Sequence, residues 1–297
     1  MNSTLSSLLP KSTTEWRKLV LAAMQMPREA VQLPSHFFVH TADHRVHVHP
    51  MYHPYSCMAA GKASAVLLLL SPAPTGCGFQ DMCLTLTKRT ISVGSHKGQM
   101  SFPGGRLDPG ESPSQAAQRE GLEEVGLHLH QYEVLGTMST ISANHLGTPL
   151  TSVVAISHEP ASPTRASPDE VDSVQYVHLS NALLHGAETQ CRVIKHVSSF
   201  SAKVPHYFPC CFTSDSQDVV SPPLQPSNVA RTDEDLDWFP VVPEDFPGEL
   251  VWGLTSFILC EFVGRIAHAI EREHPTVADA QAATILKCSE LVARDPD

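Results

Sequence analysis

Three glutamates, Glu120, Glu123 and Glu124, stand within five residues of one another. Carboxylates crowded in this way repel each other, and a divalent cation bound among them removes the repulsion. Because no Cys or His stands nearby, the donor set contains only oxygen and suits Mg²⁺ or Mn²⁺ better than zinc. A solvated acidic helix face would show the same spacing, so the wider pattern must decide between the two interpretations.

Both ends of the segment that carries the glutamates have the residues of a helix terminus. Ser112 is a typical N-cap, Pro113 suits the first helical position, and Gln115 completes a Ser-x-x-Gln capping box. Gly126 is a typical C-terminal cap, because glycine enters the left-handed conformation without steric cost. The sequence therefore predicts a helix between Ser112 and Gly126.

Two faces are expected on this helix. At 100° per residue the three glutamates fall within an arc of about 100°. Gly121, Leu122 and Val125 fall on another side, so that side is expected to pack while the glutamates present oxygen ligands. The preceding Phe-Pro-Gly-Gly at 102–105 is flexible enough to bring backbone groups close to a metal or a phosphate.

The extended pattern favours a site over a solvated face. It runs from Gly105 over five residues to Glu111, then over seven to Arg119-Glu120, and ends in Glu123-Glu124, one residue, Gly126-Leu127. This pattern resembles the signature of Nudix hydrolases, with Gly121 standing where Ala or Leu is usual. The resemblance implies an α/β fold, a Nudix-type α/β/α sandwich with a mixed β-sheet.

The resemblance also implies a role for each charged residue of the motif. Glu120, Glu123 and Glu124 would bind Mg²⁺ or Mn²⁺ for hydrolysis of a pyrophosphate bond. Arg119 is expected to orient a glutamate through a charge-assisted hydrogen bond, and Glu111 to support the loop. Glu120 and Glu170 are both candidates for the general base. The catalytic candidates are Arg119, Glu120, Glu123 and Glu170.

A second motif precedes the first. Leu-Thr-Lys-Arg at 86–89, Gly98 and Phe-Pro-Gly-Gly at 102–105 are similar to the additional signature of Nudix coenzyme A pyrophosphatases. Thr90 replaces the usual Ser or Ala, and Gly94 replaces a usual Arg. The resemblance extends weakly to His206-Tyr207-Phe208, as a late strand lining the ligand side, and to the Trp-Gly-Leu-Thr at 252–255.

This second resemblance implies hydrolysis of coenzyme A, or of its acyl derivatives, to 3′,5′-ADP and 4′-phosphopantetheine or its acyl form. A basic cluster suits the phosphates of such a substrate. The expected substrate-binding residues are Lys88, Arg89, His96, Lys97, Gly104 and Gly105. Two alternatives stay open: a Nudix hydrolase of another nucleoside diphosphate derivative such as ADP-ribose or NADH, and a non-catalytic nucleotide-binding module.

Composition limits the partners. The formal charge of −11 argues against general nucleic-acid binding and favours a small-molecule substrate met by a local basic patch. The eight cysteines include no C-x-x-C pair, and their spacing suggests neither a zinc site nor a disulfide framework. With no signal peptide evident, a reducing, intracellular compartment is expected, and the choice between cytosol, mitochondrion and peroxisome stays open. The apolar run 251–270 contains Glu261 and Arg265 and is interpreted as a packed helix, with no integral membrane segment expected. The oligomeric state is not predicted.

The expected elements divide the chain into three parts. Residues 1–58 form an N-terminal extension with a docking helix at 12–26 and a His-rich segment, for which a metal site is weighed against an irregular surface segment. Residues 59–272 form the Nudix domain, with a Pro/Ser/Asp-rich insertion at about 213–248. Residues 273–297 carry a last helix, expected over 276–292, and a tail. Strands are expected over 65–70, 83–87, 132–140, 150–156 and 171–177.

Overall fold

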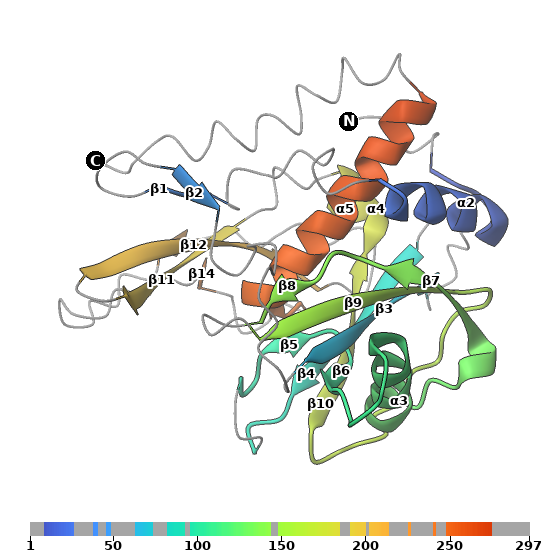
Figure 1. The fold of residues 1–297 in the computed structure, drawn as a ribbon, viewed down its shortest axis with the longest axis horizontal. Coiled ribbons are helices and arrows are strands. Elements are labelled where there is room, and N and C mark those ends of the chain that lie inside the picture. The colour runs from blue at the N-terminus through green and yellow to red at the C-terminus, as the bar shows by residue number, and fades with distance from the viewer. Residues whose placement is uncertain are drawn as a thin grey trace.

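The central strand β3 (Ser64–Pro72) is buried on both faces, as its continuous apolar run predicts. Figure 1 shows the fold in a computed structural model of the protein. Leu67 and Leu69 pack on one side of this strand, and Leu68 and Leu70 pack on the other. The strand therefore lies in the middle of a layered fold. The structure describes residues 9–26, 38–40, 46–48, 63–73, 82–92, 96–143, 148–184, 191–199, 202–213, 225–226, 240–241 and 248–274.

The main sheet is mixed. Its order is β10 (Val171–His178), β4 (Met82–Arg89), β3, β9 (Pro149–Ser157) and β7 (Tyr132–Thr137). Strands β3 and β9 are parallel, and the other neighbours along this path are antiparallel. Three short strands lie off this path and pair with its interior strands: β5 (Met100–Ser101) with β4, β6 (Gly104–Arg106) with β3, and β8 (Ile141–Ser142) with β9. The five strand predictions are confirmed, although the one expected over 132–140 ends at Thr137.

Helices cover both faces of the sheet. Helix α3 (Pro113–Val125) packs on β3 and β9 over one face, where Ala117 and Val125 meet Leu67 and Val153. Helices α2 (Thr13–Met24), α4 (Leu179–Leu184) and α5 (Gly253–Glu273) lie over the opposite face (Figure 1). The α/β/α sandwich that the resemblance implied is therefore confirmed.

Helix α2 is docked on the core, as expected for the segment 12–26. Ser12 caps its N-terminus by accepting a hydrogen bond from the Glu15 backbone N–H at 3.2 Å. Trp16 and Val20 are buried against α5 and the sheet, and Arg17 binds Glu133 of β7. This part of the predicted N-terminal extension thus shares one hydrophobic core with the central sheet.

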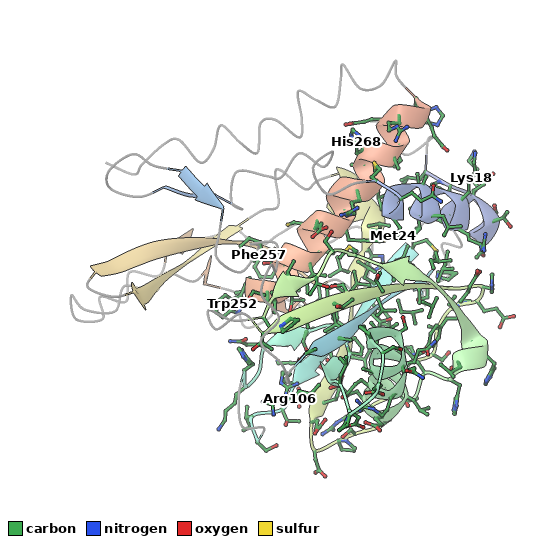
Figure 2. The ribbon with its side chains drawn as sticks, in the orientation of Figure 1. Lys18, Met24, Arg106, Trp252, Phe257 and His268 are labelled. Atoms are coloured by element: carbon green, nitrogen blue, oxygen red, sulfur yellow. The ribbon has the colours of Figure 1, made fainter. Side chains whose placement is uncertain are left out.

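Helix α5 is long and apolar enough to cross a membrane by length and composition, but 61% of its most apolar window is buried inside the protein. Phe257, Phe262 and Ile266 fill the layer between this helix and the sheet, and Figure 2 marks Phe257 near the start of α5. A core helix can be as long and apolar as a membrane-spanning one, and this helix is mostly buried in the protein. The prediction of a packed helix over 251–270 is therefore confirmed.

The remaining strands form smaller sheets. Strand β12 (Ala202–Phe212) includes the expected strand at 206–208, and it pairs with β15 (Leu250–Val251) and with β11 (Cys191–Ser199), which the sequence reading missed. Strands β1 (Phe38–His40) and β2 (Val46–Val48) pair within the His-rich segment, and β13 (Gln225–Pro226) pairs with β14 (Pro240–Val241). Several predictions lie outside the described residues: the parts of the His-rich segment that hold His44, His49 and His53, most of the insertion at 213–248, and the helix over 276–292.

Candidate active site

The glutamates lie on α3, whose ends are those that the sequence predicts. Ser112 Oγ accepts from the Gln115 backbone N–H at 3.3 Å, and Gln115 Oε1 accepts from the Ser112 backbone N–H at 2.9 Å. Gly126 ends the helix in the left-handed conformation, with φ of 68°. The two caps set the boundaries of the helix.

The prediction of separate packing and acidic faces is wrong. Glu124 is 4% exposed and lies at the centre of the buried face, about 20° around the helix from Ala117 and about 60° from Gly121. Leu122, which was expected to pack, is 43% exposed. Gly121 packs against β3 so closely that an added Cβ would lie 2.8 Å from Leu67 Cδ2. One carboxylate is therefore held inside the interface between α3 and the sheet.

Burial determines the charge state of Glu124. Loss of water is the largest of the effects that raise the pKa of Glu124 from 4.5 to about 7, and the charge of Glu120 raises it further. The Gly104 backbone N–H donates to Glu124 Oε2 at 3.2 Å, and that bond together with the charge of Arg89 opposes the rise. Burial is likewise the main cause that raises the pKa of Glu120. The two carboxyl groups form a partly desolvated pair.

Gly104 and Gly105 allow this pair to approach the backbone. A Cβ on Gly104 would collide with the Ala65 carbonyl oxygen of β3 and lie 2.7 Å from Val66 Cα. A Cβ on Gly105 would occupy the place of the Glu120 carboxylate, 2.7 Å from its Cδ. Both glycines were expected to bind substrate. Their contacts in the structure are with β3 and with the two carboxylates, and substrate binding by them stays a prediction.

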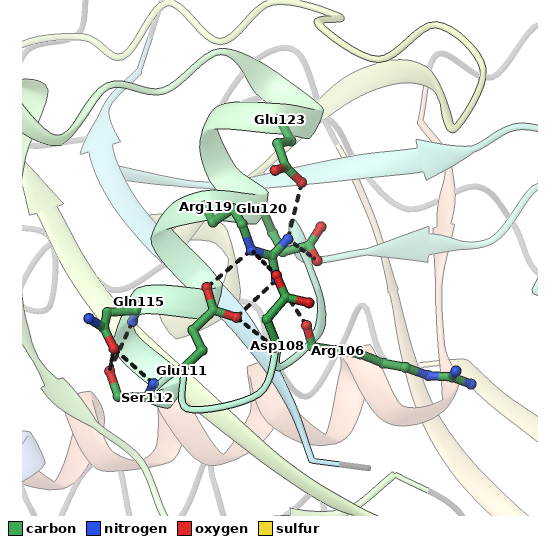
Figure 3. Close-up of polar contacts among 8 residues, drawn as sticks. All are labelled: Arg106, Asp108, Glu111, Ser112, Gln115, Arg119, Glu120 and Glu123. Atoms are coloured by element: carbon green, nitrogen blue, oxygen red, sulfur yellow. Dashed lines mark hydrogen bonds and ion pairs between the residues drawn. The ribbon is translucent and has the colours of Figure 1, made fainter. Parts of the chain in front are cut away.

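Arg119 connects most of the acidic residues of the motif (Figure 3). Its Nε and Nη2 donate to the two oxygens of Glu111, each at 3.1 Å. Its Nη1 donates to Glu120 Oε1 at 2.9 Å, as expected for a residue that orients a glutamate, and to Glu123 Oε2 at 3.1 Å. Glu111 also accepts from the Asp108 backbone N–H at 2.9 Å, which fits its predicted role in supporting the loop.

Glu123 is not gathered with the other two glutamates. Its side chain is 57% exposed and it binds Arg119 from the outer side of the helix (Figure 3). Within the described part of the chain, no group of three or more His, Cys, Asp or Glu side chains is already arranged to hold a metal ion. Arg119 thus pairs with Glu123 on the exposed side of the helix, and metal binding by Glu123 stays a prediction.

Glu120 and Glu124 nevertheless fit a hard divalent cation. Burial raises the pKa of both carboxyl groups, the charge of Glu120 adds to the rise for Glu124, and a cation between the two groups would offset these penalties. The donors are carboxylate oxygens, and Mg²⁺ completes its shell with waters and substrate phosphates. Metal binding by the glutamates of the motif stays a prediction, and Glu120 and Glu124 are the pair whose burial suits it.

The loop that carries Glu170 is fixed beside this pair. The Thr90 backbone N–H donates to the Glu170 carbonyl oxygen at 2.9 Å, and the Ala166 N–H donates to the Glu124 carbonyl oxygen at 3.1 Å. The charge of Glu170 contributes to the raised pKa of both Glu120 and Glu124. The structure therefore brings this exposed carboxylate to the same site, as its candidacy for general base requires.

The predicted basic cluster is divided between the two faces of the sheet. Arg89 lies on the face of α3, where its charge lowers the pKa of Glu124, and its buried Nε has no hydrogen-bond partner among the described residues. Lys88 follows Leu86 onto the opposite face, by strand alternation, and there it binds Glu249 at 2.5 Å.

The other members of the predicted cluster are not drawn into the site. His96 contacts Gln99 at 3.0 Å in an exposed loop, and Lys97 is also exposed. In the described part of this loop, neither makes a hydrogen bond or ion pair with the glutamates of α3; Gly94 lies outside that part. Arg89 is therefore the member of the cluster that the fold places beside the carboxylates. The roles of Lys88, His96 and Lys97 in substrate binding stay predictions.

Replacing Gly105 by alanine is expected to reduce kcat by about tenfold to a hundredfold, because the new Cβ displaces the Glu120 carboxylate from its place. The displaced group is the end of a flexible side chain, so the free energy of unfolding should fall by less than about 1 kcal/mol. Steady-state kinetics and urea denaturation measure the two effects. Gly104→Ala is the matched comparison, because its new Cβ would collide with the backbone of β3. This substitution should lower the free energy of unfolding by more than about 2 kcal/mol. Full activity of Gly105→Ala would contradict the assigned position of Glu120.

The metal-free protein is expected to become less stable as pH rises. The unfolded chain releases the Glu124 proton near 4.5 and the folded chain near 7, so the folded state binds more protons between these values and stability falls across that range. The loss from this one group is on the order of 3 kcal/mol and is complete above about pH 7.5. Urea denaturation at about pH 5 and about pH 8 measures it. Glu124→Gln should lack this component, and an unchanged pH dependence in that variant would contradict the assignment.

Comparison with known proteins finds similarity to one family over part of the chain. Residues 66–197 match the family model of the NUDIX domain. The chain is 38% identical over 79 residues to Nudix hydrolase 3 of Caenorhabditis elegans, covering 27% of this chain and 32% of that protein. It is 40% identical over 101 residues to the uncharacterized Nudix hydrolase NudL of Escherichia coli, covering 34% and 52%. The segment that matches the NUDIX domain model contains the carboxylates, Arg89, Arg119 and the two glycines described above.

The matches are partial. The chain spans about a third of the length of the first relative and about half of the second. Among solved structures, a Nudix hydrolase from Mycobacterium smegmatis, RenU, is similar over 48% of this chain and 80% of its own, at 24% identity and a TM-score of 0.34. Helices α2 and α5 lie outside the matched residues 66–197.

Proposed function

We propose that the protein is a metal-dependent pyrophosphohydrolase that cleaves coenzyme A or its acyl derivatives into 3′,5′-ADP and 4′-phosphopantetheine or its acyl form. The observation that carries the proposal is the desolvated pair of Glu120 and Glu124, with Arg89 next to it as a cation whose Nε lacks a partner among the described residues. A divalent cation suits the pair of carboxylates, and a phosphate group suits the guanidinium of Arg89.

Glu120 and Glu124 would hold Mg²⁺ or Mn²⁺, which when bound neutralises the pyrophosphate and lowers the pKa of a water. The chain's own residues supply orientation. The Gly104 N–H fixes one Glu124 oxygen, and Arg119 fixes Glu120 from the other side. Arg89 suits a non-bridging phosphate oxygen, since a guanidinium binds phosphate through paired hydrogen bonds.

Glu170 is the better of the two candidates for accepting the proton of the attacking water. Its side chain is exposed, so it can reach a water that lies outside the buried pair. Glu120, in contrast, already accepts a hydrogen bond from Arg119 and belongs to the pair that suits the cation. A carboxylate that is not occupied by a cation retains the lone pairs that a general base needs.

The choice of coenzyme A rests on the sequence of the β4–β5 region. Leu-Thr-Lys-Arg at 86–89 and Phe-Pro-Gly-Gly at 102–105 carry the resemblance to coenzyme A pyrophosphatases. The structure offers a supporting observation: both segments adjoin the carboxylates, through Arg89 in one and Gly104 in the other. ADP-ribose, NADH or another nucleoside diphosphate derivative is the alternative substrate class. A non-catalytic module is disfavoured by the presence of Glu120, Glu123 and Glu124 together.

A substrate panel tests the proposal. Coenzyme A, dephospho-coenzyme A, ADP-ribose, NADH and diadenosine polyphosphates are incubated with the full chain and Mg²⁺ or Mn²⁺, and products are separated by chromatography. We expect 3′,5′-ADP from coenzyme A and no turnover in chelator. A clear preference for ADP-ribose would reject the coenzyme A assignment, and absence of metal-dependent cleavage of every substrate would reject the enzyme.

A further inference from the structure

We propose that Thr255, on the first turn of α5, is a positioning residue for the loop that serves the carboxylates. It lies outside the segment that matches the NUDIX domain, on the other face of the sheet from Glu120 and Glu124. The inference rests on the proposed hydrolase function and extends it to a part of the chain that the family match does not cover.

The segment 249–255 contacts both residues of one cross-strand pair between β4 and β5. Lys88 of β4 and Met100 of β5 are register partners. Thr255 Oγ1 donates to the Met100 carbonyl oxygen at 3.0 Å, and Glu249 binds Lys88 at 2.5 Å. The β4–β5 pair is therefore held from the side of α5 at both of its strands.

The segment itself is anchored. Thr213, which is fully buried, donates its backbone N–H to the Glu249 carbonyl oxygen at 2.9 Å, and its Oγ1 accepts from the Glu249 N–H at 2.8 Å. At the other end, Phe257 and Ile258 fix the first turns of α5 in the core. Glu249 and Thr255 consequently act from fixed positions.

Strand β5 needs this support because it is two residues long, so few backbone bonds hold it to β4. The chain runs directly from it to the site. Phe102 is buried, the Pro103 carbonyl oxygen accepts from the Leu67 N–H at 2.8 Å, and the Gly104 N–H donates to Glu124. A shift of Met100 would move this amide, and a displacement of about 1 Å at such a point can change a rate a hundredfold.

The test compares two substitutions of the same residue. Thr255→Val keeps the shape and removes the donor, whereas Thr255→Ser keeps the donor. In the full chain with Mg²⁺ we expect Thr255→Val to lower kcat about tenfold with KM changed less than about twofold, and Thr255→Ser to retain wild-type kinetics. Equal kcat for wild type and Thr255→Val, or equal damage from both substitutions, overturns the proposal.

Amide hydrogen exchange separates this inference from the proposed reaction. In Thr255→Val the amides of residues 100–105 should exchange at least about threefold faster, while those of α3 keep their rates. This readout needs no substrate. An inactive wild type with the expected exchange would reject the hydrolase and leave the positioning role supported, whereas unchanged exchange at 100–105 overturns the positioning role itself.

A double-mutant cycle tests the second contact. If Lys88 acts through Glu249, Lys88→Met and Glu249→Gln lower kcat alike, and the double variant is no worse than either. A rise in KM that follows Lys88→Met alone would show that Lys88 meets the substrate, and would overturn its assignment to this contact.

Discussion

Glu124→Gln is expected to lower kcat by at least a hundredfold while leaving the fold intact. Glutamine keeps an oxygen that can accept from the Gly104 N–H, so the contact between α3 and the loop is preserved. It removes the buried charge that suits a divalent cation, and with it the interaction that the metal contributes. The metal-free variant should also be more stable than the wild type at about pH 8, because burial raises the pKa of Glu124 to about 7.

Steady-state kinetics with Mg²⁺ and urea denaturation at the same pH provide the two measurements. Near-normal turnover of Glu124→Gln would reject the metal assignment. The combination of lost activity and gained stability is specific, since a variant that merely unfolds would lose both. Added Mg²⁺ should stabilise the wild type and leave Glu124→Gln almost unchanged.

Glu123→Gln is the matched control on the same helix. The Glu123 side chain is 57% exposed and binds Arg119, so the structure predicts a loss of only about two- to tenfold. The sequence alone treats Glu123 and Glu124 as equivalent ligands. If the two variants were equally damaged, Glu123 would have to leave Arg119 and join the cation when the site is loaded, and the two-glutamate assignment would be wrong.

The difference between these glutamates shows what the sequence could predict. The ends of α3 were predictable because Ser112, Gln115 and Gly126 act on their own neighbours within one turn. The strands were predictable for a similar reason, since the run 65–70 has to be buried on both faces. The fold class was predicted from the family resemblance that the motif between Gly105 and Leu127 carries, and such a motif is also a local property of the sequence.

What the sequence could not supply depends on distant contacts. Helical geometry gives the angle between Glu124 and Leu122, but which arc faces the sheet depends on β3, and Leu67 settles it. Strand alternation could have separated Lys88 from Arg89 once β4 was placed. The partner of Lys88, however, is 161 residues away in sequence, beyond an insertion without periodic pattern. The basic cluster therefore looked continuous in sequence although the fold divides it.

The contact that Arg265 of α5 makes with the end of α2 is of the same long-range kind. Arg265 and Glu261 have side chains that are 3% and 2% exposed, and Arg265 Nε and Nη2 donate to Glu261 Oε1 at 3.0 and 2.8 Å. Arg265 Nη1 also donates to the Met26 carbonyl oxygen at 2.9 Å, just past the end of α2. One guanidinium thus neutralises a buried carboxylate and satisfies the backbone where α2 ends.

Arg265→Leu is expected to lower the free energy of unfolding by about 3–5 kcal/mol, because Glu261 is left as an unpaired buried charge and the Met26 carbonyl loses its donor. Urea denaturation measures the loss. Replacing both partners, in Glu261→Leu with Arg265→Leu, should recover a large part of it, since an apolar pair needs no neutralisation. A loss below about 1 kcal/mol for Arg265→Leu would show that the pair is solvated in solution.

Arg17→Met supplies the matched control, because Arg17 joins the same helix α2 to Glu133 through a pair that is 44% and 38% exposed. Removing the Arg17–Glu133 ion pair should lower the free energy of unfolding by less than about 1 kcal/mol. Arg265 and Thr255 stand on one helix, yet their expected signatures differ. Arg265→Leu should lower stability and leave kcat of the folded fraction unchanged, whereas Thr255→Val should lower kcat at nearly constant stability. Helix α5 would then combine two separable tasks, one of holding α2 on the core and one of fixing the strand that leads to the carboxylates.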